Sequence, residues 1–294
     1  MKVGLCLYSV KKALAQDPLG TMEKVAALGF RYWETPAATP APLDGSPSIP
    51  TAFGLKIPAK VAKQFIDDHG ITITGNHYFP YDYPNFEEYL EYQAALGLTF
   101  VGPSADFYTG YDDVLRKCEK LNRAAEKAKS YGLQFYYHNH FHEFQRFNGK
   151  TVEDLIYENT DPALVKLQLD TYWAARGGAD PVELIHRYAD RLVSLHQKDF
   201  AKDAGEPVDL FAQKVDPSAP IDHALYQSLR HVGTFAEVGT GVLDIQSMID
   251  AGNRAGVGMI YLEQDLTRLN ELESVRISME QFHQYGGIEW DSPQ

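Results

Sequence analysis

Short apolar segments rich in β-branched and aromatic residues alternate along the chain with longer segments whose apolar residues recur with the period of an α-helix. The apolar segments predict strands at 2–9, 30–35, 71–79, 99–105, 133–140, 165–173, 191–200 and 257–265. Because helical segments separate the strands and return the chain to the same edge of the sheet, we expect the strands to run parallel.

Glycine ends several helical segments directly before the next strand. The segments are TMEKVAALG, IPAKVAKQFIDDHG, NFEEYLEYQAALG, YDDVLRKCEKLNRAAEKAKSYG and DIQSMIDAGNRAG. A terminal glycine adopts the left-handed backbone conformation that stops a helix. The sequence therefore predicts helix ends at Gly29, Gly70, Gly97, Gly132 and Gly256.

Eight strand–helix units in 294 residues match a (β/α)8 TIM barrel, and we expect a single domain over 1–294. An open doubly wound sheet is the alternative. That fold usually carries G-x-G-x-x-G after the first strand, and the segment YSVKKALAQD lacks it. The segments 35–54 and 201–233 are expected to be long loops of the barrel.

The last four predicted strands each bring a carboxylate or imidazole to the edge where TIM barrels carry their active sites. Converging buried carboxylates repel one another unless a cation lies between them. We therefore predict a divalent metal bound by Glu143, Asp170, His196 and Glu263. Three oxygen ligands and one nitrogen favour Mn²⁺, with Mg²⁺, Co²⁺, Zn²⁺ and Fe²⁺ as alternatives.

Charge and cysteine content limit the possible binding partners and the cellular compartment. The formal net charge of −13 disfavours nucleic acid as a partner, because phosphate binding needs a basic surface. Cys6 and Cys118 form no C-x-x-C pair, which indicates a reducing compartment. The apolar run before Lys11 is too short for a signal peptide, and no later segment approaches a membrane span. We expect a cytoplasmic protein.

The chain resembles the xylose isomerase-like (β/α)8 superfamily, in its sugar phosphate isomerase/epimerase branch. The resemblance is carried by YHNHFHEF (137–144), LQLDTYWAARGGADPVELIHRYADR (167–191), LVSLHQKDF (192–200), EVGTGVLD (237–244) and YLEQD (261–265). It implies the same four metal ligands. It also implies that Glu143 and Glu263 face each other across a sugar carbon, one removing a proton and the other returning it through a metal-stabilised enediolate.

Further site residues are expected around this centre. His140 is assigned either an acid/base role or a contact to a substrate hydroxyl, and His138 a contact to the substrate or to a metal ligand. His77 is expected to contact substrate, and Lys198 to neutralise an oxyanion or a phosphate. Trp33 and Trp173 are expected to form an aromatic wall against a sugar ring, and Arg176 to contact substrate or cap a helix.

The leading hypothesis is a metal-dependent sugar isomerase or epimerase. The alternative is a lyase similar to inosose dehydratases and C-glycoside deglycosidases, in which the same proton abstraction expels a group β to the carbonyl. An endonuclease IV-like nuclease is disfavoured by the acidic charge, and a non-catalytic barrel is the remaining class. The expected partner is a small sugar or sugar derivative. A homo-oligomer or a small partner subunit is left open, and no membrane partner is expected.

Overall fold

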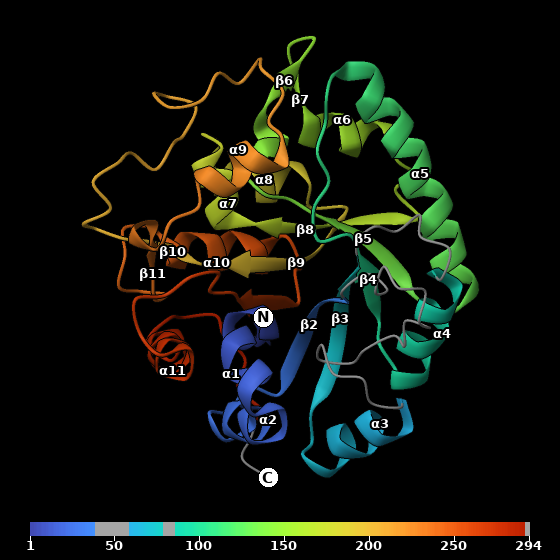
Figure 1. The fold of residues 1–294 in the computed structure, drawn as a ribbon, viewed down its shortest axis with the longest axis vertical. Coiled ribbons are helices and arrows are strands. Elements are labelled where there is room, and N and C mark those ends of the chain that lie inside the picture. Colours follow the sequence, from blue (N-terminus) through green and yellow to red (C-terminus); the bar gives the residue numbers. More distant parts are fainter. Residues whose placement is uncertain (39–58, 79–85, 292–294) are drawn as a thin grey trace.

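Eight parallel strands close into a barrel in the computed structural model, which describes residues 1–38, 59–78 and 86–291 (Figure 1). Around the barrel the strand order is β1-β12-β9-β8-β5-β4-β3-β2. The strands are β1 (Lys2–Cys6), β2 (Tyr32–Ala38), β3 (Thr72–Tyr78), β4 (Phe100–Gly102), β5 (Gln134–His138), β8 (Val165–Asp170), β9 (Leu192–Gln197) and β12 (Met259–Leu262). The predicted TIM barrel is confirmed.

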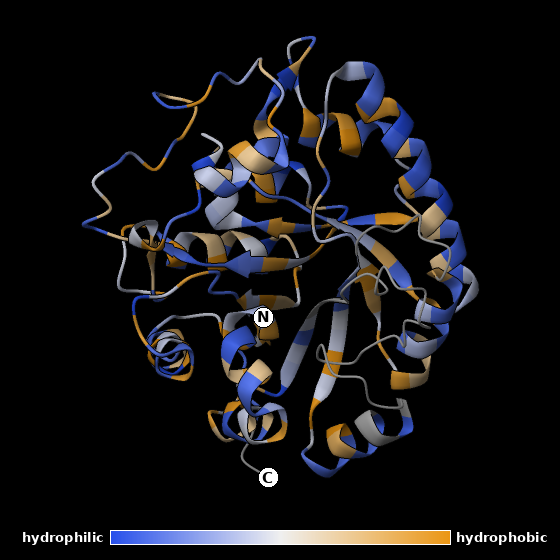
Figure 2. Cartoon of the chain, viewed as in Figure 1, coloured by the Kyte–Doolittle hydropathy of each residue, from blue (hydrophilic) through white to orange (hydrophobic). Residues whose placement is uncertain are grey.

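Helices surround the barrel and pack their apolar faces on it (Figures 1 and 2). They are α1 (Lys11–Gln16), α2 (Pro18–Ala27), α3 (Ala59–Asp68), α4 (Phe86–Leu96), α5 (Tyr111–Ser130), α6 (Val152–Asn159), α7 (Thr171–Arg176), α8 (Pro181–Arg187), α10 (Ile245–Arg254) and α11 (Glu271–Phe282). The predicted glycine stops are confirmed, with φ of +95° at Gly29, +61° at Gly70, +83° at Gly97, +77° at Gly132 and +78° at Gly256.

Several strands end earlier than the apolar segments suggested. Barrel strand β5 stops at His138 and β8 at Asp170, where the side chain of Asp170 caps helix α7 by accepting from the backbone of Trp173 at 2.8 Å. Beyond β9, residues Asp199–Phe200 form strand β10, which pairs antiparallel with β11 (Phe235–Ala236) outside the barrel. The inward and outward alternation of a strand therefore does not extend to His140 or Glu143.

The segment 201–233 is long, as predicted, but it carries helix α9 (His223–Ser228) and the 3-10 turn η3 (Val232–Thr234). Its apolar side chains form a second core, separate from the main one. The buried members of this cap core are Phe141, Tyr172, Trp173, Phe200, Leu210, Ile221, Tyr226 and Phe235. This cap core holds α9 over the C-terminal end of the barrel. The predicted loop 35–54 lies mostly outside the described residues.

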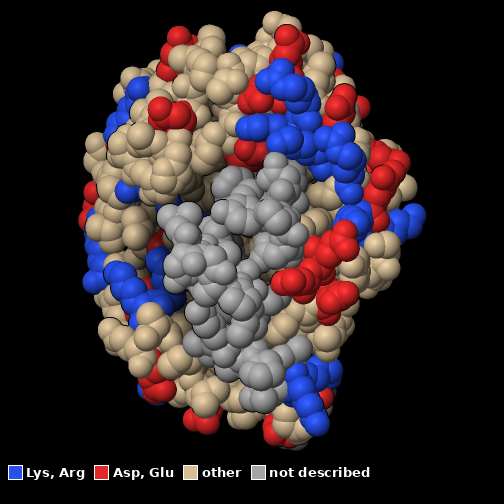
Figure 3. Space-filling model, turned by 45° about the vertical axis from the view of Figure 1, so that its right-hand side comes forward, with Lys and Arg blue, Asp and Glu red and all other residues tan. Residues whose placement is uncertain are grey.

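Charged side chains of both signs are interspersed over the face shown in Figure 3. On helix α5, for example, Asp113 contacts Arg116 at 3.1 Å and Lys117 at 3.5 Å. Among the described residues, no helix is both long enough and apolar enough to cross a membrane. The cytoplasmic location stays a prediction.

Candidate active site

Four buried side chains from four strands converge at the C-terminal end of the barrel. They are His138 at the end of β5, Asp170 at the end of β8, His196 on β9 and Glu263 just beyond β12. One nitrogen or oxygen atom from each lies within 4.8 Å of the others. Two imidazoles and two carboxylates at this spacing form a donor set that suits a divalent metal ion.

Lys198 supplies positive charge beside this cluster. Its ammonium group contacts the carboxylates of Asp170 and Glu263 and lies 3.6 Å from Asp265. Burial raises the pKa of Asp170 to about 6, although the Lys198 charge opposes that rise. For Lys198 itself, burial favours a lower pKa, but the surrounding carboxylates outweigh it and raise the pKa well above its usual value. The predicted convergence of Asp170, His196, Lys198 and Glu263 is therefore present.

A carboxylate contacts each ring nitrogen of His196. Nδ1 lies 3.0 Å from Glu263, and Nε2 contacts Glu34, a buried residue of β2. Burial lowers the pKa of His196, but the two carboxylates outweigh it and raise the pKa to about 10. Glu34 also lies 3.3 Å from Nε2 of His77. This buried carboxylate contacts two histidines of the site, whereas the sequence placed Glu34 with Trp33 in a wall against the sugar ring.

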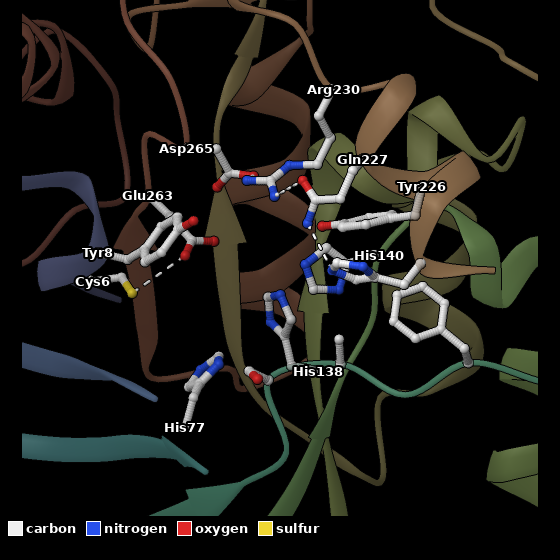
Figure 4. Close-up of a pocket in the computed structure, with 14 residues that line it drawn as sticks. Cys6, Tyr8, His77, His138, His140, Tyr226, Gln227, Arg230, Glu263 and Asp265 are labelled. Carbon is white, nitrogen blue, oxygen red and sulfur yellow. Dashed lines mark hydrogen bonds and ion pairs between the residues drawn. The ribbon is translucent and has the colours of Figure 1, made fainter. Parts of the chain in front are cut away.

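A cavity of about 300 Å³ opens beside the cluster (Figure 4). His77 and His138 lie on one side of it, and Tyr226, Gln227 and Arg230 face them from α9 and the turn that follows. Arg230 is ion-paired with Asp265 at 3.1 Å and bonded to Gln227 at 3.3 Å. Sequence reasoning missed this wall, because its residues lie in the long segment for which no fold was predicted. The available signal was that Arg230 follows Gln227 by three residues and Tyr226 by four, a spacing that places side chains on one side of a helical segment.

His140 lines the same cavity and lies beside the cluster. Its ring centroid is 5.0 Å from that of His138 and 5.3 Å from that of Tyr226. Among the described residues, its buried Nδ1 has no hydrogen-bond partner. Burial lowers the pKa of His140 well below its usual value, and the neighbouring histidines add to this effect. The lowered pKa keeps this imidazole neutral, so it is able to accept a proton.

The structure does not bring Glu143 into the cluster. Its carboxylate accepts from the Tyr137 hydroxyl at 2.7 Å and from the backbone N–H of His140 at 2.8 Å. Because β5 ends at His138, the chain turns back through η2 (His142–Phe144) and directs Glu143 to the face of β5 that carries Tyr137. Adjacent strand residues face opposite sides, so this face is turned away from His138. His138 occupies the place in the cluster that the sequence assigned to Glu143.

The remaining predicted residues divide between the site and the core. His77 lines the cavity. Trp173 packs behind His140, with ring centroids 5.7 Å apart. Trp33 is fully buried in the main core, where its Nε1 donates to the carbonyl of Phe30 at 3.0 Å, and it does not line the cavity. The two tryptophans therefore do not form one wall.

Arg176 also lies outside the cavity lining. Its guanidinium donates to the carbonyls of Pro207 at 2.8 Å and Val208 at 2.9 Å and pairs with Glu206 at 2.5 Å. These bonds anchor the segment that leads to α9. The structure thus gives Arg176 a structural contact in place of the expected contact with substrate.

The glycine-rich segment EVGTG (237–241) surrounds a carboxylate of the chain itself. Asp199 accepts from the backbone N–H groups of Gly239 at 3.0 Å, Gly241 at 2.8 Å, Leu243 at 3.0 Å and Phe200 at 2.8 Å. These donors are therefore already occupied.

Comparison with known proteins identifies the family. The sequence model of the xylose isomerase-like TIM barrel matches residues 22–284, and the chain belongs to this family. An inosose dehydratase from Lactiplantibacillus plantarum is 30% identical over 164 residues, which are 55% of this chain and 50% of that protein. The match thus spans about half of that relative's length.

Solved structures agree with the fold. A sugar phosphate isomerase/epimerase from Parabacteroides distasonis superposes with a TM-score of 0.74 at 25% identity, over 98% of this chain and 95% of that one. A protein named IOLI, solved with a bound zinc atom, superposes with a TM-score of 0.66 at 14% identity, over 97% of each chain. The chain is thus similar both to a protein named as a dehydratase and to one named as an isomerase/epimerase.

Proposed function

We propose that this chain is a divalent-metal-dependent enzyme that removes a proton next to a carbonyl of a keto-sugar or keto-inositol, and that a hydroxyl β to the carbonyl then leaves as water. The single observation that carries the proposal is the placement of His140. Its half-buried imidazole lines the cavity beside the candidate metal ligands.

The candidate ligands His138, Asp170, His196 and Glu263 fit a divalent cation. The sequence expectation of Mn²⁺ rested on three carboxylates, and the second imidazole favours Mn²⁺, Fe²⁺, Co²⁺ or Zn²⁺ over Mg²⁺. When bound, such an ion supplies a Lewis acid for the carbonyl oxygen. The zinc carried by the related IOLI protein supports a divalent metal here.

His140 is proposed as the general base. It accepts the proton from the carbon next to the carbonyl, and the electron pair of that C–H bond forms a C=C bond as the β C–O bond breaks. The departing oxygen takes up the proton held by His140 and leaves as water. Lys198 remains an ammonium group and balances the charge of Asp170 and Glu263 throughout.

Elimination is favoured over epimerisation by the position of Glu143. The epimerase mechanism that the resemblance implies uses Glu143 and Glu263 on opposite sides of one carbon, and the carboxylate of Glu143 lies outside the cluster that contains Glu263. The inosose dehydratase relative supports the same outcome. Isomerisation remains the second candidate, because the related structure at 25% identity is named a sugar phosphate isomerase/epimerase.

The test uses metal-loaded protein incubated in D₂O with a keto-inositol and with keto-sugars, followed by NMR. We expect loss of a substrate C–H signal together with an unsaturated, dehydrated product. His140→Gln is expected to keep its metal and to lose about 10²–10⁴-fold in rate. His186→Gln, an exposed histidine of α8, is the matched control. Wild-type-like turnover by His140→Gln would rule out the base, and isomeric sugars as sole products would favour the second candidate.

A further inference from the structure

A chain of hydrogen bonds lies beneath the candidate metal ligands. We propose that Glu34 and Gln168 are positioning residues that fix which nitrogen of each ligand histidine binds the ion, so that His138 coordinates through Nε2 and His196 through Nδ1. This inference rests on the metal site proposed above, but its central step concerns the protein alone.

The chain begins at Glu34, whose carboxylate is about 1% exposed. Its Oε1 accepts from the hydroxyl of Tyr136 at 2.6 Å and from the side-chain amide of Gln168 at 2.8 Å. A carboxylate offers acceptors to its neighbours. The group of Gln168 that faces Glu34 must therefore be the NH₂, because the reverse orientation would place two oxygen atoms 2.8 Å apart.

The second N–H of Gln168 is used as well, since Nε2 donates to the hydroxyl of Ser194 at 2.9 Å. With the amide fixed, its Oε1 faces two imidazoles. It lies 3.0 Å from Nδ1 of His138 and 3.1 Å from Nε2 of His77. An amide oxygen only accepts, so both of these nitrogens must carry hydrogen.

This pattern of donors and acceptors determines which nitrogen of each histidine is free to bind the metal. His138, protonated at Nδ1, keeps the lone pair of a neutral imidazole on Nε2. His196 contacts Glu34 through Nε2, which leaves Nδ1, 3.0 Å from the candidate ligand Glu263, as its metal-facing nitrogen. A partner on the other ring nitrogen is the usual means by which proteins orient a histidine ligand.

Two candidate groups of metal ligands overlap at this site. His77, His138 and His196 also lie within 4.8 Å of one another and form a possible three-histidine site. Nε2 of His77 is occupied by Gln168 and lies 3.3 Å from Glu34. We assign the metal to the group that contains Asp170 and Glu263, because a cation there offsets two buried carboxylates, and leave Nδ1 of His77 for the substrate.

The experiment is ¹⁵N NMR of protein labelled at histidine, first without metal and then loaded with diamagnetic Zn²⁺. We expect His138 protonated at Nδ1 in both states, and Zn²⁺ on Nδ1 of His196 in the second. Glu34→Gln is expected to mix the two tautomers of His138 and to weaken Zn²⁺ binding about 10- to 100-fold in a chelator competition. Gln168→Met, which removes the amide, is expected to have the same two effects. It is the second variant to be measured if Glu34→Gln does not fold. Ser194→Ala is the matched control that spares the amide oxygen.

The outcomes separate this inference from the proposed function. A His138 protonated at Nε2 in the metal-free protein, or unchanged in both Glu34→Gln and Gln168→Met, overturns the inference even if Zn²⁺ binds. A protein that binds no divalent metal but shows His138 protonated at Nδ1 overturns the metal site and supports the tautomer assignment.

Discussion

The Tyr137 hydroxyl donates to the carboxylate of Glu143 at 2.7 Å, in a fully buried setting one residue away from the cavity-lining His138. Tyr137 in turn lies 2.8 Å from the hydroxyl of Tyr108. Glu143 is therefore part of a polar network on the outer side of β5. Burial raises its pKa to about 8, although the bonds from Tyr137 and His140 oppose the rise.

This pKa predicts a dependence of stability on pH. Below pH ~4.5 Glu143 is protonated in both the folded and the unfolded chain, whereas between ~4.5 and ~8 only the folded chain keeps the proton. The contribution of Glu143 to stability is thus lost as pH rises through this window. Glutamine carries no such proton. Relative to the wild type, the free energy of unfolding of Glu143→Gln should therefore rise by a total on the order of 4 kcal/mol by pH 8.

The measurement is urea unfolding of both proteins at intervals from pH 4.5 to 8.5. The difference between them is the quantity of interest, because buried acids that do not interact with Glu143 contribute equally to both. Glu153 adds to this difference, since burial and the neighbouring charge of Glu143 both raise its pKa. A difference that stays constant with pH would mean that Glu143 is ionised in the folded protein.

Metal content separates the two residues proposed for the same ligand position. His138→Ala should lower the bound divalent metal at least tenfold relative to wild type, whereas Glu143→Gln should keep it. Elemental analysis after dialysis against a weak chelator gives the answer. The opposite result, with metal lost only in Glu143→Gln, would restore Glu143 as the ligand.

Arg176→Met should destabilise the protein by about 3 kcal/mol, because it leaves the carbonyls of Pro207 and Val208 without their donor and removes one of the ion pairs of Glu206. A double-mutant cycle with Glu206→Gln measures the coupling of the Arg176–Glu206 pair, since Glu206 also contacts Lys214 and His231. A role in substrate contact would appear instead as a raised KM with an unchanged free energy of unfolding.

Asp199→Asn should cost about 2 kcal/mol, since an amide nitrogen would face backbone N–H donors that now meet a carboxylate. Asp112→Asn, at an exposed position of α5, is the control and should change stability by less than about 0.5 kcal/mol. Thermal unfolding compares the two. Equal changes in the two variants would show that the Asp199 carboxylate does not contribute to stability.

The sequence predicted the barrel because strand and helix periods, and the glycine stops, are local properties of the chain. It also placed Asp170, His196 and Glu263 at one edge of the barrel, where they lie close together, because each lies at or directly beyond a strand whose direction is fixed by its pairing; their role as metal ligands stays a prediction. These residues need no knowledge of loops to be placed.

The errors arose where the chain leaves a strand. Glu143 lies five residues beyond the last residue of β5, and the turn that reverses its direction depends on contacts with Tyr137 and the backbone of His140. Glu34 was expected beside Trp33 in a wall against the sugar ring, and its contact with His196 was not predicted, because nothing local shows that its carboxylate meets a residue far along the chain. Trp33 was misassigned for the same reason, since facing inward or outward on β2 depends on register.

The two walls of the cavity are stabilised by different sets of apolar residues. The barrel that carries His138 and Glu263 packs in the main core, whereas Tyr226 belongs to the cap core around α9. Substitutions at Tyr226, Gln227 or Arg230 can thus reshape what the pocket admits while leaving the candidate metal ligands in place. Selectivity and chemistry are able to evolve independently in such a protein, on separate parts of one chain.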